Sequence, residues 1–136
     1  MDATDLKIIK YLSKDGRATI KEIGQHVNLS SPAVTERIKR LEERGVIKGY
    51  RAEVNYAKLG KSIQAMVSVD VDLKKYDKFC EFCRKKDAIL SMVHIIGPYN
   101  ALLSVAVEDS DELSRLLAQI NIFGVSQTSV VLNKVF

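Results

Sequence analysis

A run of small, polar and basic side chains between residues 31 and 44 is the part of the chain whose residue types are best suited to chemistry. Small and polar side chains can approach the edges of DNA bases in a major groove, and lysine and arginine can bind phosphates. The alternative is a solvated helix surface on which acids and bases alternate. We expect base contacts from the first five candidates and phosphate contacts from the other four: Ser31, Pro32, Ala33, Thr35 and Glu36, then Arg37, Lys39, Arg40 and Arg44.

The two cysteines have the spacing of a redox motif or of half a zinc site. No second pair and no nearby histidine accompanies Cys80 and Cys83, so one chain cannot complete a four-ligand zinc site. Both share the helix face of Tyr76 and Phe79, where thiols pack as small apolar groups. The sequence also lacks a Gly-rich phosphate loop, a Ser/His/Asp set and paired carboxylates, and His94 is expected to pack within an apolar strand. We therefore predict no metal, no cofactor and no enzyme activity.

Positive charge is concentrated in the first half of the chain, which has 136 residues and a net charge of +4. Residues 1–60 hold 12 lysines and arginines against 8 acids, whereas residues 61–136 hold 9 of each. A localised basic surface suits a polyanionic partner. No apolar run approaches the ~20 residues that span a bilayer, and the first residues lack the features of a secretory signal. We expect a cytoplasmic protein with no membrane partner.

Two short helices are predicted before the candidate contact residues. Apolar residues at helical spacing, beginning with Leu6, indicate a first helix over residues 3–13. Thr19 and Glu22 form a capping box, in which each side chain can satisfy a backbone N–H at the start of a helix. This second helix is expected to run to about Val27.

The candidate contact residues lie on a predicted third helix. Ser30 or Ser31 can cap its start, and Gly45 can end it in the left-handed conformation. Two short helices joined by a tight turn, the second one basic at its front, are typical of a helix-turn-helix. A narrow apolar stripe faces the core of this domain: Val34, Ile38 and Leu41.

Several short motifs occur together in the first 50 residues. They are Leu6-x-x-Ile9-x-x-Leu12, Asp15-Gly16-Arg17-Ala18-Thr19, Ile23-Gly24, Leu29-Ser30-Ser31-Pro32, the run from Val34 to Glu42 and the run from Gly45 to Tyr50. In order and spacing they resemble the leucine-responsive/asparagine regulator (Lrp/AsnC) family of prokaryotic transcription regulators. The resemblance is dense over residues 2–60 and looser beyond. It implies a regulator that binds double-stranded DNA as dimers, which assemble further into tetramers or octamers.

The two halves of the chain are joined by a segment of different character. Strand-forming residues that alternate weakly predict a strand over residues 46–54, and the turn residues of 55–60 mark a boundary. We expect a winged-helix-like helix-turn-helix domain at 1–49 and a connecting strand and linker at 50–60. The remainder, 61–136, is expected to be a domain for oligomerisation and effector binding.

Residues 61–136 predict the element order βαββαβ. This order gives a ferredoxin-like sandwich in which both helices cover one face of the sheet, so the fold class is α+β. The strands are expected at 63–71, 88–96, 101–107 and 125–135, and the helices at 74–86 and 109–120.

The second face of this predicted sheet has no helix to cover it. An apolar face left in water invites association, and a domain of this size is short of core, so we predict a homodimer through this domain. A dimer also carries two recognition helices to half-sites one helical turn apart. The open face is expected to hold Met66, Ser68 and, depending on strand register, some of Ile89, Val93, Leu102 and Val130.

The loop Gly97-Pro98-Tyr99-Asn100 is the candidate regulatory site. In the resembled family a Gly-x-aromatic-Asp loop at this point helps to bind a free amino acid between dimers. Gly97 and Tyr99 match, but Asn100 stands where Asp is usual, and an amide offers an ammonium group no full negative charge. Gln127 and Thr128 on the last strand are expected to add contacts. An ordinary hairpin turn is the alternative.

Two other functions fit the same predicted architecture. One is an architectural protein that wraps or bends DNA with weak sequence preference. The other is an enzyme, because a few haem-pathway decarboxylases resemble this arrangement and act on a tetrapyrrole. A tetrapyrrole site would need several basic side chains around a large pocket, and the second half offers Arg84, Arg115, His94 and the lysines.

Overall fold

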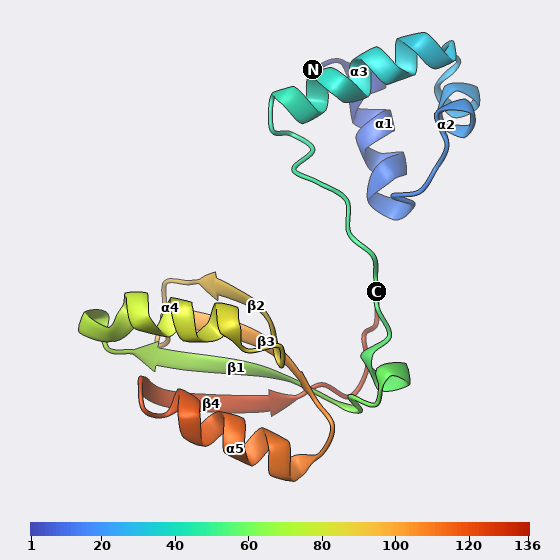
Figure 1. The fold of residues 1–136 in the computed structure, drawn as a ribbon. Coiled ribbons are helices and arrows are strands. Elements are labelled where there is room, and N and C mark those ends of the chain that lie inside the picture. Colours follow the sequence, from blue (N-terminus) through green and yellow to red (C-terminus); the bar gives the residue numbers. More distant parts are fainter. The chain divides into compact units, whose positions relative to one another are not determined.

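The computed structural model describes residues 1–136, and the chain divides into two units, Met1–Glu53 and Val54–Phe136 (Figure 1). This division falls inside the predicted connecting segment 50–60. None of the helices combines the length and the apolar character that crossing a membrane requires. Each unit has its own core and is described separately.

The first unit consists of the three predicted helices. They are α1 (Ala3–Lys14), α2 (Ile20–Val27) and α3 (Ser31–Glu43). Asp2 caps α1 by accepting from the amide of Asp5, and Thr19 and Glu22 form the predicted capping box of α2. Ser30, one of the two predicted candidates, caps α3. The helix-turn-helix prediction is confirmed.

The core of the first unit is built from a few side chains of all three helices. Ile8, Ile23, Val34, Ile38 and Leu41 are its buried members. The predicted apolar stripe of α3 is therefore confirmed. Leu6, the first apolar residue of α1, is 56% exposed, while Ile8 is fully buried. Two residues along a helix are about 200° apart, so both cannot face the same core.

The turn between α2 and α3 depends on two residues with unusual backbone freedom. Asn28 adopts the left-handed conformation, with φ of 58°. The amide of Leu29 then donates to the carbonyl of Gly24 over 3.0 Å. A Cβ on Gly24 would lie 2.6 Å from the carbonyl oxygen of Leu29. Only glycine allows α2 and the start of α3 to approach this closely.

The predicted strand over residues 46–54 does not form. Gly45 has a φ of 72° and ends α3 as predicted, and the amides of Val46 and Ile47 then both donate to the carbonyl of Leu41. A strand needs a neighbouring strand to complete its hydrogen bonds, and the first unit contains only helices. Regular structure resumes with a 3₁₀ turn at Tyr56–Leu59.

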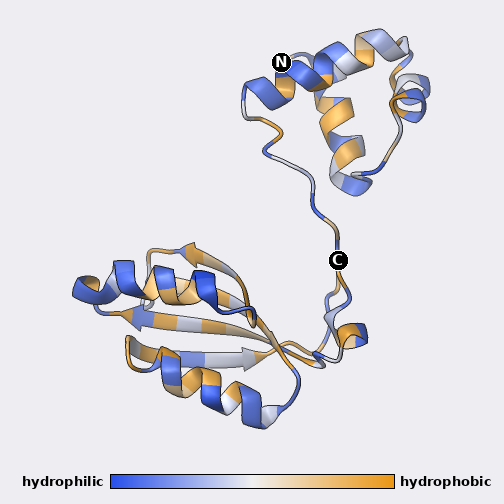
Figure 2. Cartoon of the chain, in the orientation of Figure 1, coloured by the Kyte–Doolittle hydropathy of each residue, from blue (hydrophilic) through white to orange (hydrophobic).

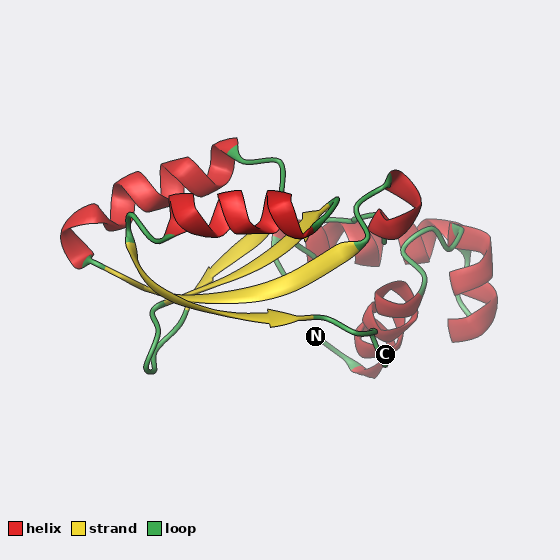
Figure 3. Cartoon of the chain, turned by 90° about the horizontal axis from the view of Figure 1, so that it is seen from below, coloured by secondary structure: helices red, strands yellow, loops and turns green.

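The second unit has the predicted ferredoxin-like fold. Its sheet has the order β2-β3-β1-β4, and every neighbouring pair is antiparallel. Helices α4 and α5 lie on the same face of this sheet, and the other face is open (Figure 3). The elements are β1 (Ile63–Val71), α4 (Tyr76–Lys85), β2 (Ile89–His94), β3 (Ala101–Val107), α5 (Ser110–Ile120) and β4 (Gly124–Val130).

Alternating residues of the strands face the two helices, and hydrophobic and hydrophilic residues follow one another along the strands in Figure 2. Val67 of β1 and Leu103 of β3 are opposite each other and fully buried. Phe79 of α4 and Ile120 of α5 pack on them as parts of one core. The last strand ends at Val130, earlier than the predicted 135.

The register decides which apolar residues lie on the open face. Met66 and Ser68 lie there, and so do Leu102 and Val93, which pair with Ser68 and Leu102 respectively. Ile89, in contrast, packs against the core, because the ladder between β2 and β3 shifts between Ile89 and Ser91. Val130 also leaves the predicted set: it pairs with buried Ala65 and so belongs to the helix side.

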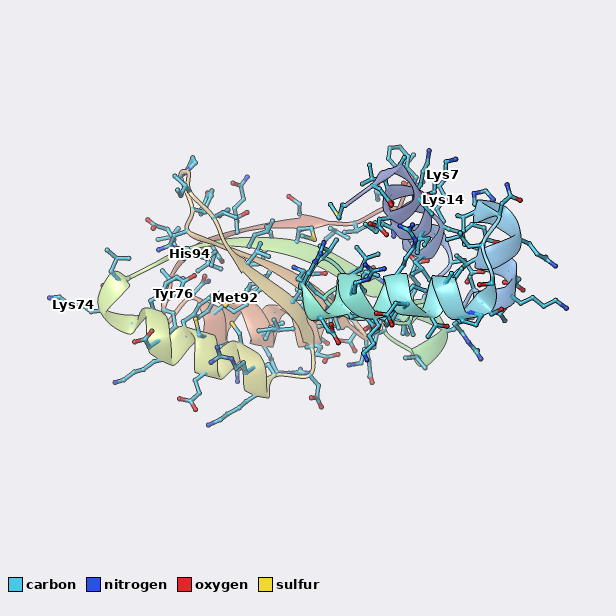
Figure 4. The ribbon with its side chains drawn as sticks, turned by 90° about the horizontal axis from the view of Figure 1, so that it is seen from above. Lys7, Lys14, Lys74, Tyr76, Met92 and His94 are labelled. Carbon is cyan, nitrogen blue, oxygen red and sulfur yellow. The ribbon has the colours of Figure 1, made fainter.

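His94 is not the packed core histidine that the sequence predicts. It is exposed, because it ends β2, an edge strand, where no further strand covers it. Its ring lies 4.8 Å from the ring of Tyr76 on α4. Figure 4 shows the two side chains next to each other on the helix-covered side of the sheet.

Replacing Gly24 by Ala is expected to destabilise the first unit by about 1–3 kcal/mol. Alanine is the better helix former by about 1 kcal/mol, but an overpacked side chain that meets a backbone carbonyl costs more. Thermal unfolding followed through the methyl NMR signals of Ile8 and Ile23 measures this change. Gly16→Ala is the control, since its Cβ would meet only a ring carbon of Tyr50 at 4.0 Å. Equal unfolding temperatures for both variants would contradict the close contact.

Candidate nucleic-acid interface and regulatory loop

The exposed side of α3 holds most of the predicted contact residues. The helix is fixed by its apolar stripe, and the rest of its surface is open to solvent. Arg40 and Glu36 approach to 4.0 Å, but both are more than half exposed, so this pair restrains neither side chain strongly. The exposed members are Ser31, Pro32, Thr35, Glu36, Lys39, Arg40 and Arg44, while Ala33 is half-buried.

Arg37 has a different partner from the phosphate that the sequence predicts. Its Nη1 donates to both carboxylate oxygens of Asp2, at 2.8 and 2.7 Å, and to Oδ1 of Asp5 at 3.0 Å. Its side chain is only 25% exposed. This residue joins α3 to the first turn of α1, and its contact with a phosphate stays a prediction. The sequence signal for this pairing is the presence of two acids, Asp2 and Asp5, at the start of the first helix.

The electrostatics of this cluster favour the charged forms of its members. The hydrogen bond from Arg37, together with the amide of Asp5, lowers the pKa of Asp2 to about 2. The two carboxylates in turn raise the pKa of Arg37. Asp2 has two tasks, because the carboxylate that caps α1 also pairs with Arg37 of α3.

Acid is expected to weaken the first unit through Asp2. A carboxyl whose pKa is lower in the folded state stabilises the fold above its unfolded value of 3.8, and this contribution is lost as the pH falls towards 2. Asp2→Asn keeps a good helix cap but removes the charge. The variant should unfold at a lower temperature than the wild type at pH 6, and the gap should close near pH 2.

The methyl NMR signals of Ile8 and Ile23 again report on the first unit alone. Glu43→Gln is the control, because this exposed carboxylate on α3 forms no ion pair. A gap for Asp2→Asn that does not change with pH would show that the Arg37 pair is unimportant.

The loop between β2 and β3 extends from the sheet on the face opposite the helices (Figure 3). Its Tyr99 hydroxyl donates to Oε1 of Gln127 on β4 over 3.0 Å. Gln127 pairs with Ser68 and so lies on the open face. The fold thus brings together two of the predicted effector residues from segments that are 28 residues apart.

Two other predicted effector residues are not part of this pair. Thr128 follows Gln127 along β4 and therefore faces the opposite side of the sheet, where it pairs with buried Val67. Gly97 is exposed, and a Cβ placed on it would meet no atom within 4 Å. Gln127 and Thr128 are adjacent in the sequence, but their side chains lie on opposite faces of the sheet.

Asn100 has a structural task that the sequence did not reveal. Its Oδ1 accepts from the amide of Val71 at 2.8 Å, and its Nδ2 donates to the carbonyl of the same residue at 3.0 Å. The amide of Asn100 donates to the carbonyl of Val69. The side chain thus continues the ladder between β1 and β3 by one step. Asparagine suits this position because it offers both a donor and an acceptor.

Asn100→Asp is expected to destabilise the second unit by about 1–3 kcal/mol. The carboxylate retains an acceptor for the amide of Val71, but it leaves the carbonyl of Val71 without a donor. Chemical denaturation followed through methyl NMR signals of Val67 measures this loss. In Asn55→Asp, the control, the side chain only accepts from Lys58 and an acid can replace it. If Asn100→Asp were as stable as Asn55→Asp, the two hydrogen bonds between Asn100 and Val71 would not stabilise the second unit.

The two cysteines of the second unit are not gathered with other metal-ligating side chains. Burial raises the pKa of the Cys83 thiol to about 12, which disfavours the reactive thiolate. No three His, Cys, Asp or Glu side chains lie close enough together to hold a metal ion. Arg84 and His94 border a shallow hollow of about 480 Å³ between α4 and β2, but Arg115 does not belong to it.

Comparison with known proteins identifies both units. Residues 1–48 match the model of winged helix-turn-helix DNA-binding domains, and residues 64–136 match that of the Lrp/AsnC ligand binding domain. An uncharacterized HTH-type transcriptional regulator of Bacillus subtilis, YezC, is 34% identical over 98% of this chain and 94% of its own. The regulator FL11 of Pyrococcus furiosus is also 34% identical, over 97% of this chain and 88% of its own.

Solved structures agree over the full length. Bacillus subtilis LrpC superposes with a TM-score of 0.91 at 29% identity, covering 100% of this chain and 97% of its own. The regulator NMB0573 of Neisseria meningitidis, solved as a complex with L-Met, gives a TM-score of 0.90 at 26% identity, covering 100% and 92%. The chain therefore belongs to the Lrp/AsnC family of DNA-binding transcription regulators.

Proposed function

We propose that this regulator reads a two-fold symmetric operator with the α3 helices of a homodimer. The exposed N-terminal part of α3 carries the proposal, because small and polar side chains there stand clear of the core on a helix of suitable length. In this proposal Ser31, Thr35 and Glu36 contact base edges. Lys39 and Arg40 contact phosphates together with Arg44.

The open sheet face of the second unit supports the homodimer. Val93 is 49% exposed and Val125 is 74% exposed, and Met66 and Leu102 lie on the same face. Contiguous apolar patches are rare on the surfaces of soluble monomers, and where they occur they often mark interaction sites. A second copy of the same chain would cover it with an identical face and give the DNA-binding units the two-fold symmetry of a palindromic site.

The pair of Tyr99 and Gln127 supports binding of a small effector at the β2–β3 loop. The hydroxyl and the amide lie on the exposed side of the sheet and can exchange their mutual hydrogen bond for one to a ligand. NMB0573 was solved with L-Met, so we propose a free amino acid as the effector class. Asn100 is held by Val71, and the ammonium group of such a ligand would have to find its negative partner elsewhere. We further propose that the protein works in the cytoplasm.

Selection of bound DNA from a random-sequence library, followed by sequencing, tests the proposal. A shared palindrome is expected for the wild type, and its recovery should change with L-methionine or another amino acid in the binding buffer. Thr35→Ala should alter the selected sequence but keep the salt dependence. Lys39→Gln should keep the sequence and lower the salt slope by about 0.9.

Lys78→Gln is the matched control, because it removes one exposed lysine from the second unit. Its selected sequence and salt slope should equal those of the wild type. Indiscriminate capture of DNA would instead favour the architectural function, and a monomer that retains no DNA would overturn the proposal.

A further inference from the structure

A row of lysines lies on α1, away from the residues assigned above to DNA. Lys7, Lys10 and Lys14 follow the spacing i, i+3 and i+7, which places them on one side of a helix. All three are exposed. In Figure 4, Lys7 and Lys14 project from the side of α1 that is turned away from α3. We call these three residues the α1 lysine stripe.

The stripe borders a shallow hollow with an aromatic floor. Tyr11 of α1 and His26 of α2 line this hollow of about 560 Å³ together with the three lysines. The rings of Tyr11 and His26 are 4.9 Å apart. His26 is exposed and can present a ring N–H to an anion that the lysines attract.

No charge within the chain neutralises the stripe. None of its three ammonium groups forms an ion pair, and the nearby acids of the same helix, Asp2 and Asp5, are engaged by Arg37. The two acids lie on the side of α1 that meets α3, whereas the lysines project from the other side of the same helix and are left for an external partner.

The dimensions of the stripe suit a DNA backbone. Seven residues of α-helix span about 10.5 Å. A duplex presents one phosphate charge per ~1.7 Å of its axis, so several phosphates lie within reach of three ammonium groups. The excess positive charge of the chain lies in its first 60 residues. Duplex DNA is the polyanion already bound by this unit, which favours it over other anionic partners.

We propose that the α1 lysine stripe is a second DNA-contact surface, which binds phosphates of the duplex that flanks the segment facing α3. This inference rests on the proposed function, because it takes α3 as the first contact. The flanking duplex must curve around the first unit to reach α1. The stripe would then add affinity that depends on salt and on duplex length, but not on sequence.

The test compares three variants of the full chain on a duplex of about two helical turns and one of about six. The first variant combines Lys7→Gln, Lys10→Gln and Lys14→Gln. The second, Lys58→Gln, Lys74→Gln and Lys78→Gln, removes the same charge from exposed positions of the second unit. The third removes the α3 charges through Lys39→Gln, Arg40→Gln and Arg44→Gln. Binding is measured by fluorescence anisotropy at salt concentrations from about 50 to 200 mM.

On the long duplex, the α1 variant should lower the slope of log K against log salt by about 2–3, because each lost phosphate contact removes about 0.9. On the short duplex it should match the wild type, and the second-unit variant should match the wild type on both. An α1 variant that equals the second-unit variant on the long duplex would overturn the inference. If the inference fails in this way, loss of binding by the α3 variant on both duplexes would still support the proposed function.

Chemical protection tests the same contact without any substitution. Acetylation of the wild-type protein, read by mass spectrometry, should be slowed at Lys7, Lys10 and Lys14 by the long duplex but not by the short one. Lys74 should react equally in both. Equal reaction of the stripe with and without the long duplex would overturn the inference, even where the wild type binds DNA.

Discussion

The narrow apolar stripe of α3 is the constraint on which the DNA-binding unit depends. Val34, Ile38 and Leu41 are buried against Ile8 of α1 and Ile23 of α2. Each such side chain contributes about 1.5–3 kcal/mol on burial, whereas a surface ion pair contributes about 0–1 kcal/mol. The core therefore fixes the position of α3. Because only one residue in three or four faces inward, the rest of the helix is free to contact a ligand.

In the sheet of the second unit, side chains that face the core alternate with side chains that face outward. Its inward residues, such as Val67 and Leu103, fill the core beneath α4 and α5, and the outward residues remain available for assembly and ligands. Asn100 shows how closely the two tasks lie together. Its side chain completes the ladder at Val71, while its neighbour Tyr99 reaches across the open face to Gln127. The loop is thus both the end of the sheet and a candidate site.

Local signals in the sequence predicted most of the fold, because the physics that sets them is local. The capping residues Asp2, Thr19 and Ser30 mark helix starts through hydrogen bonds to residues only three positions away. Gly45 marks the end of α3 for a similarly local reason. The family resemblance added the long-range arrangement that such signals do not contain, including the order of the two domains.

The predictions that failed required knowledge of partners far away in the chain. Residues 46–54 have strand-forming side chains, but no strand lies beside them in the first unit. His94 is exposed because β2 is at an edge of the sheet. The residues of a segment indicate which secondary structure it can form. The elements packed against it in the fold decide whether that structure forms.

The role of a charged side chain depends especially strongly on its partners in the fold. Arg37 stands among basic residues on the recognition helix, and residue type alone predicts a phosphate contact, yet its guanidinium is turned towards two carboxylates of α1. Lys7 stands on a helix that the sequence assigns only a supporting position, yet no acid pairs with it. A nucleic-acid surface is therefore defined by the cations left over after internal pairing, and these are found only once the partners of every acid are known. In this unit, Arg37 is paired with acids on one side of α1, and the lysines on the other side of that helix have no acid partner.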